Sequence, residues 1–444
     1  MPPETVDLLV NARWVLPVVP ENALYSDCSL VVNQGRIVGL MPSAEARRRF
    51  HSRHTVDLDN HVLMPGLVNA HAHLAMSLFR GYADDLPLDV WLEQHIWPAE
   101  ARWVGEEFCR TGAELAMAEM LRSGTTCFAD MYFFPDQVAE LAREHGLRCQ
   151  LAFPILNFAT AWARDGDDYI HKGLKVRDNF KDDELIRFAF GPHAPYTVDD
   201  RYLEKVVTYA NELDTGVQIH LHETQAEVDD ALSSTGQRPI ERLHRLGLLT
   251  ANTQCVHMSA LTDSDIELLV DSRAHVIHCP RSNLKLGNGF CPTHWLLDKG
   301  VNVALGTDGA ASNNSLDLFS EMQFAALLAK GQSGDPAVLD SHQALRMATL
   351  NGARALGMED TIGSLEPGKA ADMIAVDLSH LPQQPLYNPL SQLVYTHVCH
   401  RVSHAWIAGE QKVDNFELSG FEEHELAAKA RQWRDRIGQD RATI

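Results

Sequence analysis

The 444-residue sequence has few basic side chains and no closely spaced pair of cysteines. Its 38 lysines and arginines stand against 60 aspartates and glutamates, so the formal net charge at pH 7 is −22. Because polyanions are bound by clusters of basic side chains, this balance argues against nucleic acid or an anionic membrane surface as a partner. None of the eight cysteines belongs to a C-x-x-C pair. This spacing argues against a disulfide framework or a thiolate zinc site and indicates reduced thiols in the cytoplasm.

Targeting and membrane-spanning segments are lacking as well. The N-terminus, which reads Met1-Pro-Pro-Glu, has no basic region of the kind that begins a signal peptide. No apolar run approaches the roughly 18 residues of a membrane span. The chain is long enough for a large buried core, and its length allows up to about three domains.

Short apolar runs alternate with helical stretches between residues 63 and 365. The runs lie at 62–71, 125–130, 148–153, 188–191, 216–220, 253–257, 275–278 and 301–306. Strands that alternate with helices are typical of a parallel sheet, and eight such units predict an α/β fold with a (β/α)8 TIM barrel. A doubly wound open sheet is the alternative, which is disfavoured because no G-x-G-x-x-G follows the first strand.

Strand-like segments without intervening helices occur at both chain ends. These segments are 7–16, 29–32, 36–40, 371–377 and 402–408. We therefore expect residues 1–62 and 366–444 to form one composite β-sandwich domain, with residues 63–365 as the barrel. A charged amphipathic pattern over 421–437 predicts a closing helix.

Histidine is abundant, with 22 residues, and it is the commonest metal ligand in proteins. His71 and His73 end the first barrel strand, and residues i and i+2 of a strand point to the same face. At the carboxyl end of a barrel strand, that face looks into the active-site mouth. The two imidazoles are therefore candidates to share one metal ion, although two hydrogen-bonded residues at a strand end would show the same pattern.

Three further strands end in residues of the same kind. His220 or His222, followed by Glu223, ends the fifth run, His257 ends the sixth, and Asp308 ends the eighth. Each has an ordinary alternative on its own, such as a helix-capping acid, a buried histidine or an Asp-Gly turn. Together, three histidines and a carboxylate predict one divalent metal, Zn²⁺ or alternatively Fe²⁺ or Mn²⁺.

Four motifs in this chain are similar to motifs of the amidohydrolase superfamily. They are residues 65–73, 220–223, 282–287 and 306–314. They look like its deaminase and chlorohydrolase branch, which uses one metal, and the match spans nearly the whole chain. The metal ligands that this resemblance implies are His71, His73, His220 and Asp308. His220 is preferred to His222 because the family ligand lies three residues before the glutamate.

Residues 91–100 and 191–196 resemble, more narrowly, the 5-methylthioadenosine/S-adenosylhomocysteine deaminase family. This resemblance implies that Trp91 packs near a purine nucleoside, although packing in the core would also account for a tryptophan there. It implies that Glu100 accepts hydrogen bonds from the ribose hydroxyls and that His193 contacts the substrate near the metal.

The family also pairs the homocysteine carboxylate of the larger substrate with an arginine. Arg164 is the first candidate for this role and Arg177 the second, with a surface position as the alternative for either. A homo-oligomer is a further expectation that comes from the family.

The same resemblance implies hydrolytic deamination of the adenine ring. Asp308 would accept the proton of the attacking water, and His257 would orient that water. Glu223 would contact the substrate and give a proton to N1. The products would be the inosyl nucleoside and ammonia.

Two other kinds of function are alternatives. Another member of the same branch, a deaminase of guanine, adenosine or a triazine or a chlorohydrolase, would keep the metal ligands and change the pocket. A non-catalytic metal-binding scaffold on the same barrel is the second, because a fold alone does not determine function. A zinc site of the cytidine-deaminase type is excluded, because Cys279-Pro280 has no P-C-x-x-C pattern around it.

Overall fold

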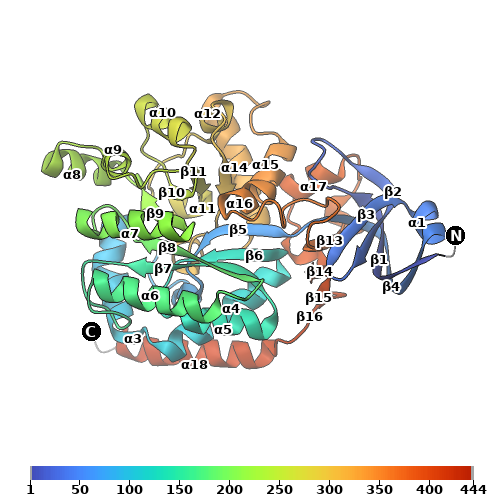
Figure 1. The fold of residues 1–444 in the computed structure, drawn as a ribbon, viewed down its shortest axis with the longest axis horizontal. Coiled ribbons are helices and arrows are strands. Elements are labelled where there is room, and N and C mark those ends of the chain that lie inside the picture. Colours follow the sequence, from blue (N-terminus) through green and yellow to red (C-terminus); the bar gives the residue numbers. More distant parts are fainter. Residues whose placement is uncertain (1–2, 442–444) are drawn as a thin grey trace. The chain divides into compact units, whose positions relative to one another are not determined.

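A computed structural model describes residues 3–441 of the chain, and within them lie two eight-stranded sheets (Figure 1). Their contacts divide the chain into two units. The first comprises the residues up to Val68, Met120–Cys127 and Asp317–Gly420, and the second comprises Asn69–Glu119, Phe128–Leu316 and the residues from Phe421 onward. Within residues 3–441, no helix has the length and apolar character needed to cross a membrane.

One sheet is a parallel barrel, as the alternating pattern predicts. Its strands, in sheet order and in chain order alike, are β5 (Leu67–Ala72), β6 (Thr125–Asp130), β7 (Arg148–Ile155), β8 (Ile186–Pro192), β9 (Gly216–Leu221), β10 (Thr253–His257), β11 (His275–His278) and β12 (Val303–Leu305). Just past β12, the Asp308 N–H donates to the His71 carbonyl over 3.1 Å, which brings the last strand beside the first. The eight predicted runs overlap these strands, although residues 62–65 of the first run belong to the other sheet, and the (β/α)8 prediction is confirmed.

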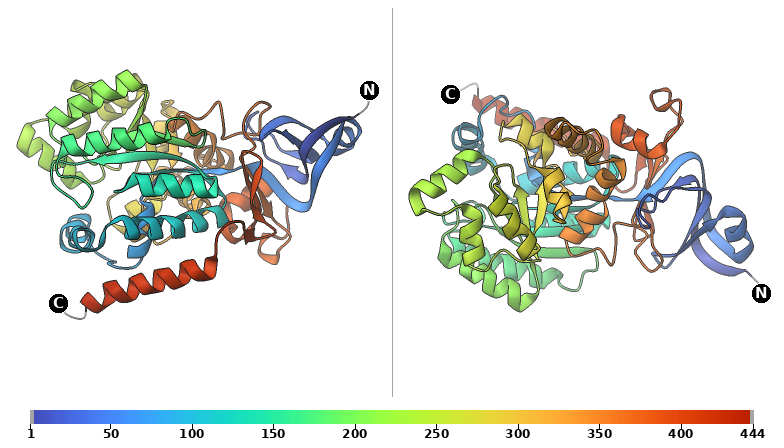
Figure 2. Two further views of the ribbon diagram at one scale, coloured as in Figure 1. Left: turned by 60° about the horizontal axis from the view of Figure 1, so that its bottom comes forward. Right: turned by 90° about the horizontal axis from the view of Figure 1, so that it is seen from above.

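Helices follow the barrel strands and surround the sheet (Figure 2). They are η1 (Leu74–Phe79), α2 (Leu88–Val90), η2 (Trp91–Ile96), α3 (Trp97–Trp103), α4 (Glu106–Arg122), α5 (Pro135–His145), α6 (Gly166–Phe180), α7 (Asp200–Leu213), α8 (Gln225–Thr235), α9 (Pro239–Arg245), α10 (Asp263–Ser272), α11 (Pro280–Lys285), α12 (Thr293–Asp298) and α13 (Ala310–Asn313). Side-chain caps begin several of them: the Thr224 hydroxyl accepts from the N–H of Glu227 at α8, and Thr262 accepts from Asp265 at α10. These helices therefore begin, and the segments that precede them end, at defined residues.

The other sheet joins both ends of the chain in the order β16-β15-β14-β13-β4-β1-β2-β3. Its strands are β1 (Glu4–Val15), β2 (Tyr25–Asn33), β3 (Arg36–Pro42), β4 (Phe50–Pro65), β13 (Met373–Asp377), β14 (Val402–Ile407), β15 (Glu410–Asp414) and β16 (Glu417–Leu418). The helices of this unit are α1 (Ser43–Arg49), α14 (Leu318–Ser333), α15 (Ser341–Met347), α16 (Leu350–Ala355), η3 (Leu381–Gln383), α17 (Pro389–Tyr395) and η4 (Cys399–Arg401). The chain ends join because β13 runs antiparallel to β4, with Met373 opposite Pro65.

Strand β4 is longer than the sequence indicates. Residues 50–61 were not predicted as a strand, because they are mostly polar or charged and show no clear alternation of apolar side chains. Residues Phe50–Leu58 form a strand because they pair in parallel with Glu4–Ala12 of β1, which satisfies backbone groups along that side.

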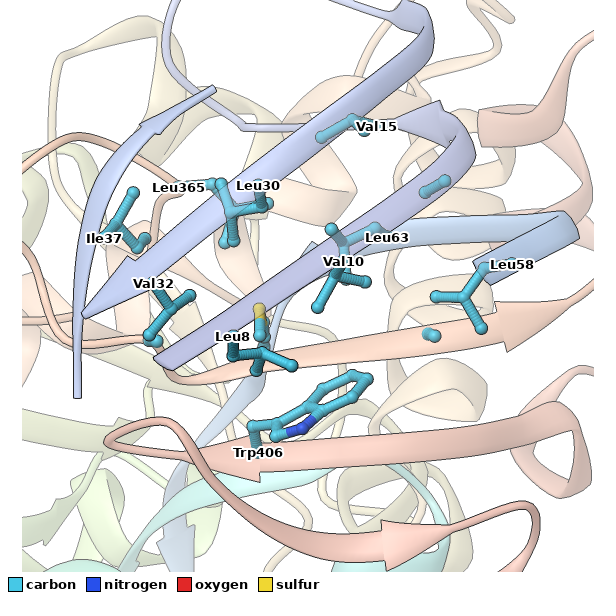
Figure 3. Close-up of a cluster of buried hydrophobic side chains, with 14 of the residues drawn as sticks. Leu8, Val10, Val15, Leu30, Val32, Ile37, Leu58, Leu63, Leu365 and Trp406 are labelled. Atoms are coloured by element: carbon cyan, nitrogen blue, oxygen red, sulfur yellow. The ribbon is translucent and has the colours of Figure 1, made fainter. Parts of the chain in front are cut away.

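The composite sheet closes around an apolar core (Figure 3). Leu8 and Val10 of β1, Leu30 of β2 and Trp406 of β14 belong to one buried cluster. Since three strands separate β14 from β2 in the sheet order, the sheet must curl for these side chains to meet. This packing of facing inner surfaces is the arrangement expected of a β-sandwich.

The C-terminal helix α18 (Glu423–Arg441) lies beside α4 (Figure 2). The ring of Trp433 meets that of Phe108 edge-on, with centroids 5.3 Å apart, and Lys429 reaches Glu114 over 3.4 Å. The expected boundary at residue 366 groups this helix with the β domain, whereas its apolar side chains pack within the second unit.

Candidate active site and metal centre

A cavity of about 340 Å³ opens at the carboxyl ends of the barrel strands. The polar residues in its wall are His73, Glu100, Tyr132, Thr160, His193, Tyr196, His220, Glu223, His257, Asp308 and Ser312. The apolar wall includes Leu88, Trp91, Leu92, Trp97, Phe133 and Phe158. Polar groups gathered within a mainly apolar cavity are typical of a binding site for a small molecule.

Four histidine rings converge at the bottom of the cavity, and each is fixed through its Nδ1 atom. The pairs are His71 with Gln218 Oε1 (2.8 Å), His73 with the Met131 carbonyl (2.6 Å), His220 with the His193 carbonyl (2.7 Å), and His257 with Asn283 Oδ1 (2.9 Å). Because each partner is an oxygen acceptor, each Nδ1 carries the proton and each Nε2 has a free lone pair. A metal-binding histidine usually donates the N–H of its other ring nitrogen to an oxygen acceptor in this way.

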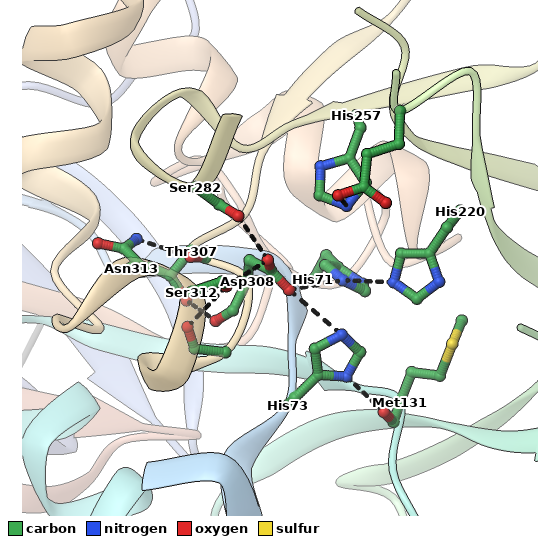
Figure 4. Close-up of polar contacts among 12 residues, drawn as sticks. His71, His73, Met131, His220, His257, Ser282, Thr307, Asp308, Ser312 and Asn313 are labelled. Atoms are coloured by element: carbon green, nitrogen blue, oxygen red, sulfur yellow. Dashed lines mark hydrogen bonds and ion pairs between the residues drawn. The ribbon is translucent and has the colours of Figure 1, made fainter. Parts of the chain in front are cut away.

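The free Nε2 atoms and a carboxylate oxygen form two overlapping groups that share His71, one with His220 and His257 and the other with His73 and Asp308 (Figure 4). His71 Nε2 lies 3.2 Å from His220 Nε2, and Asp308 Oδ1 lies 3.4 Å from His71 Nε2 and 3.2 Å from His73 Nε2. Facing lone pairs repel unless a positive charge lies between them. A proton on His73 can supply that positive charge. Burial acts to lower the pKa of His73, but the hydrogen bond to Asp308 raises it to about 9. The donor set therefore fits a divalent metal ion.

Asp308 is held from both of its carboxylate oxygens. Its Oδ1 faces the histidines, and its Oδ2 accepts hydrogen bonds from the hydroxyls of Ser282 (2.6 Å) and Ser312 (2.5 Å). Burial acts to raise the pKa of Asp308, but its close contacts with the His71 and His73 rings outweigh burial and hold the pKa well below its usual range. Asp308 is therefore ionised and able to accept a proton.

Glu223 lies two residues past the end of β9, and its pKa shifts in the opposite direction. Burial raises its pKa to about 8, and the negative charge of Asp308 adds to the rise. The Asn288 amide nitrogen donates to Glu223 Oε1 over 2.8 Å, and His257 Nε2 lies 3.6 Å from the same oxygen. Glu223 is therefore a carboxyl that holds a proton near neutral pH, as a general acid must.

Sequence reasoning missed Glu227, which orients the turn that carries Glu223. Its carboxylate accepts from the backbone N–H of His222 (3.1 Å) and from that of Glu223 (2.7 Å). The spacing Thr224-x-x-Glu227 at the start of α8 is a capping-box signal that could have indicated this residue. Ser282 and Ser312 lie in the motifs at 282–287 and 306–314 but were given no role, and Asn288, just past the first motif, was missed.

Both ring nitrogens of His222 are engaged away from the cavity. Its Nδ1 donates to the Ala260 carbonyl over 2.9 Å, and its Nε2 accepts from the Ile240 N–H over 3.1 Å. The structure thus brings His220, rather than His222, to the cluster.

Trp91, Glu100 and His193 all line the cavity. Trp91 is buried in η2, where its indole N–H donates to the Ala83 carbonyl over 3.0 Å. Glu100 accepts from the Tyr132 hydroxyl over 2.6 Å, and burial raises its pKa to about 7. Burial lowers the pKa of His193 to about 3, so this imidazole is neutral.

The two candidate arginines are not brought to the cavity. Arg164 Nε lies 3.2 Å from Asp168 Oδ2, and its side chain is 83% exposed. Arg177 pairs with its neighbour Asp178 over 3.2 Å. Among the residues that the structure describes, no lysine or arginine lines the cavity.

Comparisons with known proteins agree with this geometry. Residues 62–412 match the model of the amidohydrolase family. A protein of Teredinibacter turnerae named 5-methylthioadenosine/S-adenosylhomocysteine deaminase is 56% identical over 437 residues, which cover 98% of this chain and 99% of the relative. A relative of the same name from Saccharophagus degradans is 51% identical, with 98% of each chain covered. A crystal structure described as an adenosine deaminase from Xanthomonas campestris with bound zinc has a TM-score of 0.98 and 50% identity, and the match covers 99% of this chain and 100% of that chain.

Proposed function

The chain belongs to the amidohydrolase family, and we propose that it is a metal-dependent deaminase of 5′-methylthioadenosine, S-adenosylhomocysteine or both. Hydrolysis at purine C6 would leave the inosyl nucleoside and release ammonia. One observation carries the proposal: two buried carboxyls face the same cavity with opposite pKa shifts, Asp308 low and Glu223 high. Such a pair supplies the base and the acid that addition of water to a purine requires.

His71, His73, His220 and Asp308 would hold the metal ion, since their donor atoms converge and their other polar atoms are hydrogen-bonded. Zn²⁺ is supported by the related structure with bound zinc, and Fe²⁺ and Mn²⁺ are alternatives for the same donors. When bound, the ion polarises a water molecule and lowers its pKa toward about 7.

The side chains of the chain itself would carry the protons. Asp308, ionised and fixed by two serine hydroxyls, accepts a proton from the water that attacks C6. His257, held through its Nδ1, orients that water with its Nε2. Glu223 donates its proton to N1, so that the ring nitrogen does not carry a full negative charge. The C6–N bond then breaks: the proton taken up by Asp308 passes to the amino group, which leaves as ammonia, and the C6 hydroxyl returns a proton to Glu223 as the carbonyl forms.

The upper part of the cavity would hold the nucleoside. Trp91 offers an apolar ring in the wall, and Glu100 offers carboxylate oxygens that can accept from ribose hydroxyls. The hydrogen bond from Tyr132 fixes the direction in which that carboxylate points.

The cavity favours a neutral, apolar 5′ substituent. Its wall includes Leu88, Leu92 and Phe158, and no lysine or arginine of the described residues reaches it. A methylthio group matches such a wall, whereas the homocysteine carboxylate would lack a charged partner. Adenosine is a second candidate substrate, because a protein described as an adenosine deaminase shares this fold at 50% identity.

We also propose a cytoplasmic location and a homo-oligomeric state. All eight cysteines are free thiols, as expected in a reducing compartment. The oligomer follows from the family resemblance and is tested by measuring the molar mass in solution.

The test is a panel of substrates presented to the metal-loaded protein. Methylthioadenosine, S-adenosylhomocysteine, adenosine, guanine and a chlorotriazine are compared by release of ammonia or chloride. We expect ammonia from methylthioadenosine with the highest kcat/KM. Turnover of only guanine or the triazine would replace the proposal with another activity of the same branch. A protein that binds metal and hydrolyses nothing in the panel would be a scaffold.

A further inference from the structure

Residues 282–288 form the end of α11 and the turn after it, and they contact three side chains of the site, among them Asp308, whose hydrogen bond from Ser282 is drawn in Figure 4. The contacts are Ser282 Oγ to Asp308 Oδ2 (2.6 Å), Asn283 Oδ1 to His257 Nδ1 (2.9 Å) and Asn288 Nδ2 to Glu223 Oε1 (2.8 Å). The base, the histidine that orients water and the acid are thus all touched by one short segment, in which the proposed function gives Asn288 no task.

This segment is held firmly in place. The Asn288 N–H donates to the Asn283 carbonyl over 2.8 Å, and Lys285 Nζ lies 2.6 Å from Asp84 Oδ1. Gly287 and Gly289 flank Asn288 with φ of +68° and +110°, a backbone conformation that side chains other than glycine rarely adopt. The two glycines allow the chain to turn sharply on either side of Asn288, so that its amide points inward.

The amide of Asn288 is not explained by stability alone. Its side chain is buried, and among the described residues its Oδ1 has no hydrogen-bond partner. A buried polar atom without a partner destabilises the fold. An amide that is retained under this cost, with its nitrogen on the proposed acid, points to a functional role.

We propose that Asn288 is a positioning residue that directs the proton of Glu223 to Oε2, the oxygen left free for the substrate. This inference rests on the proposed function, in which Glu223 protonates purine N1. A carboxylic acid has one hydroxyl oxygen and one carbonyl oxygen, and the carbonyl oxygen is the better acceptor. Because the Asn288 nitrogen can only donate, it makes Oε1 the carbonyl oxygen and Oε2 the hydroxyl.

Asn288 thus orients the proton of Glu223 without itself contacting the substrate. With the amide present, every protonated Glu223 presents its O–H from the same oxygen. Without it, the proton is shared between two oxygens, one of which faces the protein. An aspartate in its place would accept the Glu223 proton instead of repelling it, and so hold it away from N1.

The experiment compares kcat and KM for methylthioadenosine in metal-loaded Asn288→Ala and Asn288→Asp. General acid–base catalysis contributes about 10²–10⁴-fold, so partial misdirection of the proton is expected to lower kcat by about 10- to 100-fold in Asn288→Ala. KM should stay within about threefold, and Asn288→Asp should lose more than Asn288→Ala. Phe290→Ala, an exposed change on the same loop, is the matched control and should keep wild-type kcat. If Asn288→Ala does not fold, Asn288→Ser takes its place.

A double mutant separates this inference from the proposed function. When Asn288→Ala is added to Glu223→Gln, no further loss of the residual rate is expected, because the two residues act as one unit. A further loss, a wild-type kcat in Asn288→Ala, or a loss confined to KM or metal content would overturn the positioning role. A fully active Glu223→Gln would instead refute the proposed function itself.

Discussion

Burial acts on Glu223 and Asp308 alike, yet their pKa values shift in opposite directions. Asp308 receives two serine hydroxyls and faces two imidazoles, and these donors stabilise its charge. Glu223 receives one amide and faces the Asp308 charge, so that burial dominates and its pKa rises to about 8. The division of roles between acid and base is therefore a property of the partners of each residue rather than of residue type.

Replacement of Glu223 tests the acid at the scale of one residue. Glu223→Gln keeps the shape of the side chain and removes its ionisable proton. We expect kcat to fall by about 10²–10⁴-fold. Metal content, measured by elemental analysis, should be unchanged because Glu223 is not among the converging ligands. Wild-type turnover in this variant would show that the acid lies elsewhere.

The pH dependence of kcat/KM follows from the same carboxyl. Glu223 can donate only while protonated, which holds below its pKa, so activity should be lost as the pH rises through about 8. A divalent ion in the site would stabilise the carboxylate and move this limb to lower pH. The measurement is a pH profile of wild type. A profile that stays flat to well above pH 8 would contradict the assignment.

At the scale of elements, the strand ends carry the site because the backbone turns sharply there. His222, His257 and Asp308, at or just past the ends of β9, β10 and β12, have φ of 50°, 77° and 59°, which non-glycine residues rarely adopt. Such conformations cost about 1–3 kcal/mol each and are concentrated at functional sites. At His257 and Asp308 the turn places the side chain in the cavity instead of along the strand.

Gly306 is the position at which packing between elements can be tested. A Cβ at this residue would lie 2.9 Å from the Cβ and from the carbonyl oxygen of His71, so β12 could not approach β5 as it does. Gly306→Ala should displace His71 and lower both bound metal per chain and kcat. Metal content and kcat are the measurements. Gly331→Ala is the control, because that glycine lies in α14 with nothing within 4 Å of its Cβ position.

At the scale of the whole molecule, the net charge of −22 is continued in the cavity, whose described wall has carboxylates and no lysine or arginine. A negatively charged substrate tail therefore finds no counterion there. The excess of acidic residues, which argues against polyanions as partners, therefore also disfavours a small substrate with an anionic tail.

A cavity wall without a lysine or arginine among the described residues predicts a ranking of the two thioether nucleosides. Loss of a hydrogen bond to a charged group costs about 1.5–3 kcal/mol, which corresponds to roughly 10- to 100-fold in kcat/KM. We expect S-adenosylhomocysteine to be poorer than methylthioadenosine by this factor in steady-state assays. 5′-Butylthioadenosine, long but uncharged, is the control for size and should resemble methylthioadenosine. Equal kcat/KM for all three would show that the tail has a cationic partner.

Particular residues show how far sequence reasoning reaches. The eight barrel strands and the residues at their ends were predictable, because apolar runs and strand-end positions are local patterns. Residues 50–61 of β4 were missed because their strand depends on pairing with β1, a segment distant in the sequence. Arg164 was proposed from its place before the fourth strand, and in the structure it pairs with Asp168 at the surface.

The sequence by itself determined the barrel, the composite sheet and the strand-end histidines and acids, since periodicity and spacing along the chain encode them. Only the tertiary structure decided which atoms meet. It brings His220 rather than His222 to the cluster, leaves the described cavity wall without a lysine or arginine, and places the Asn288 amide on Glu223, 65 residues away in the chain. Such contacts depend on how distant segments pack, and neither spacing nor composition records that.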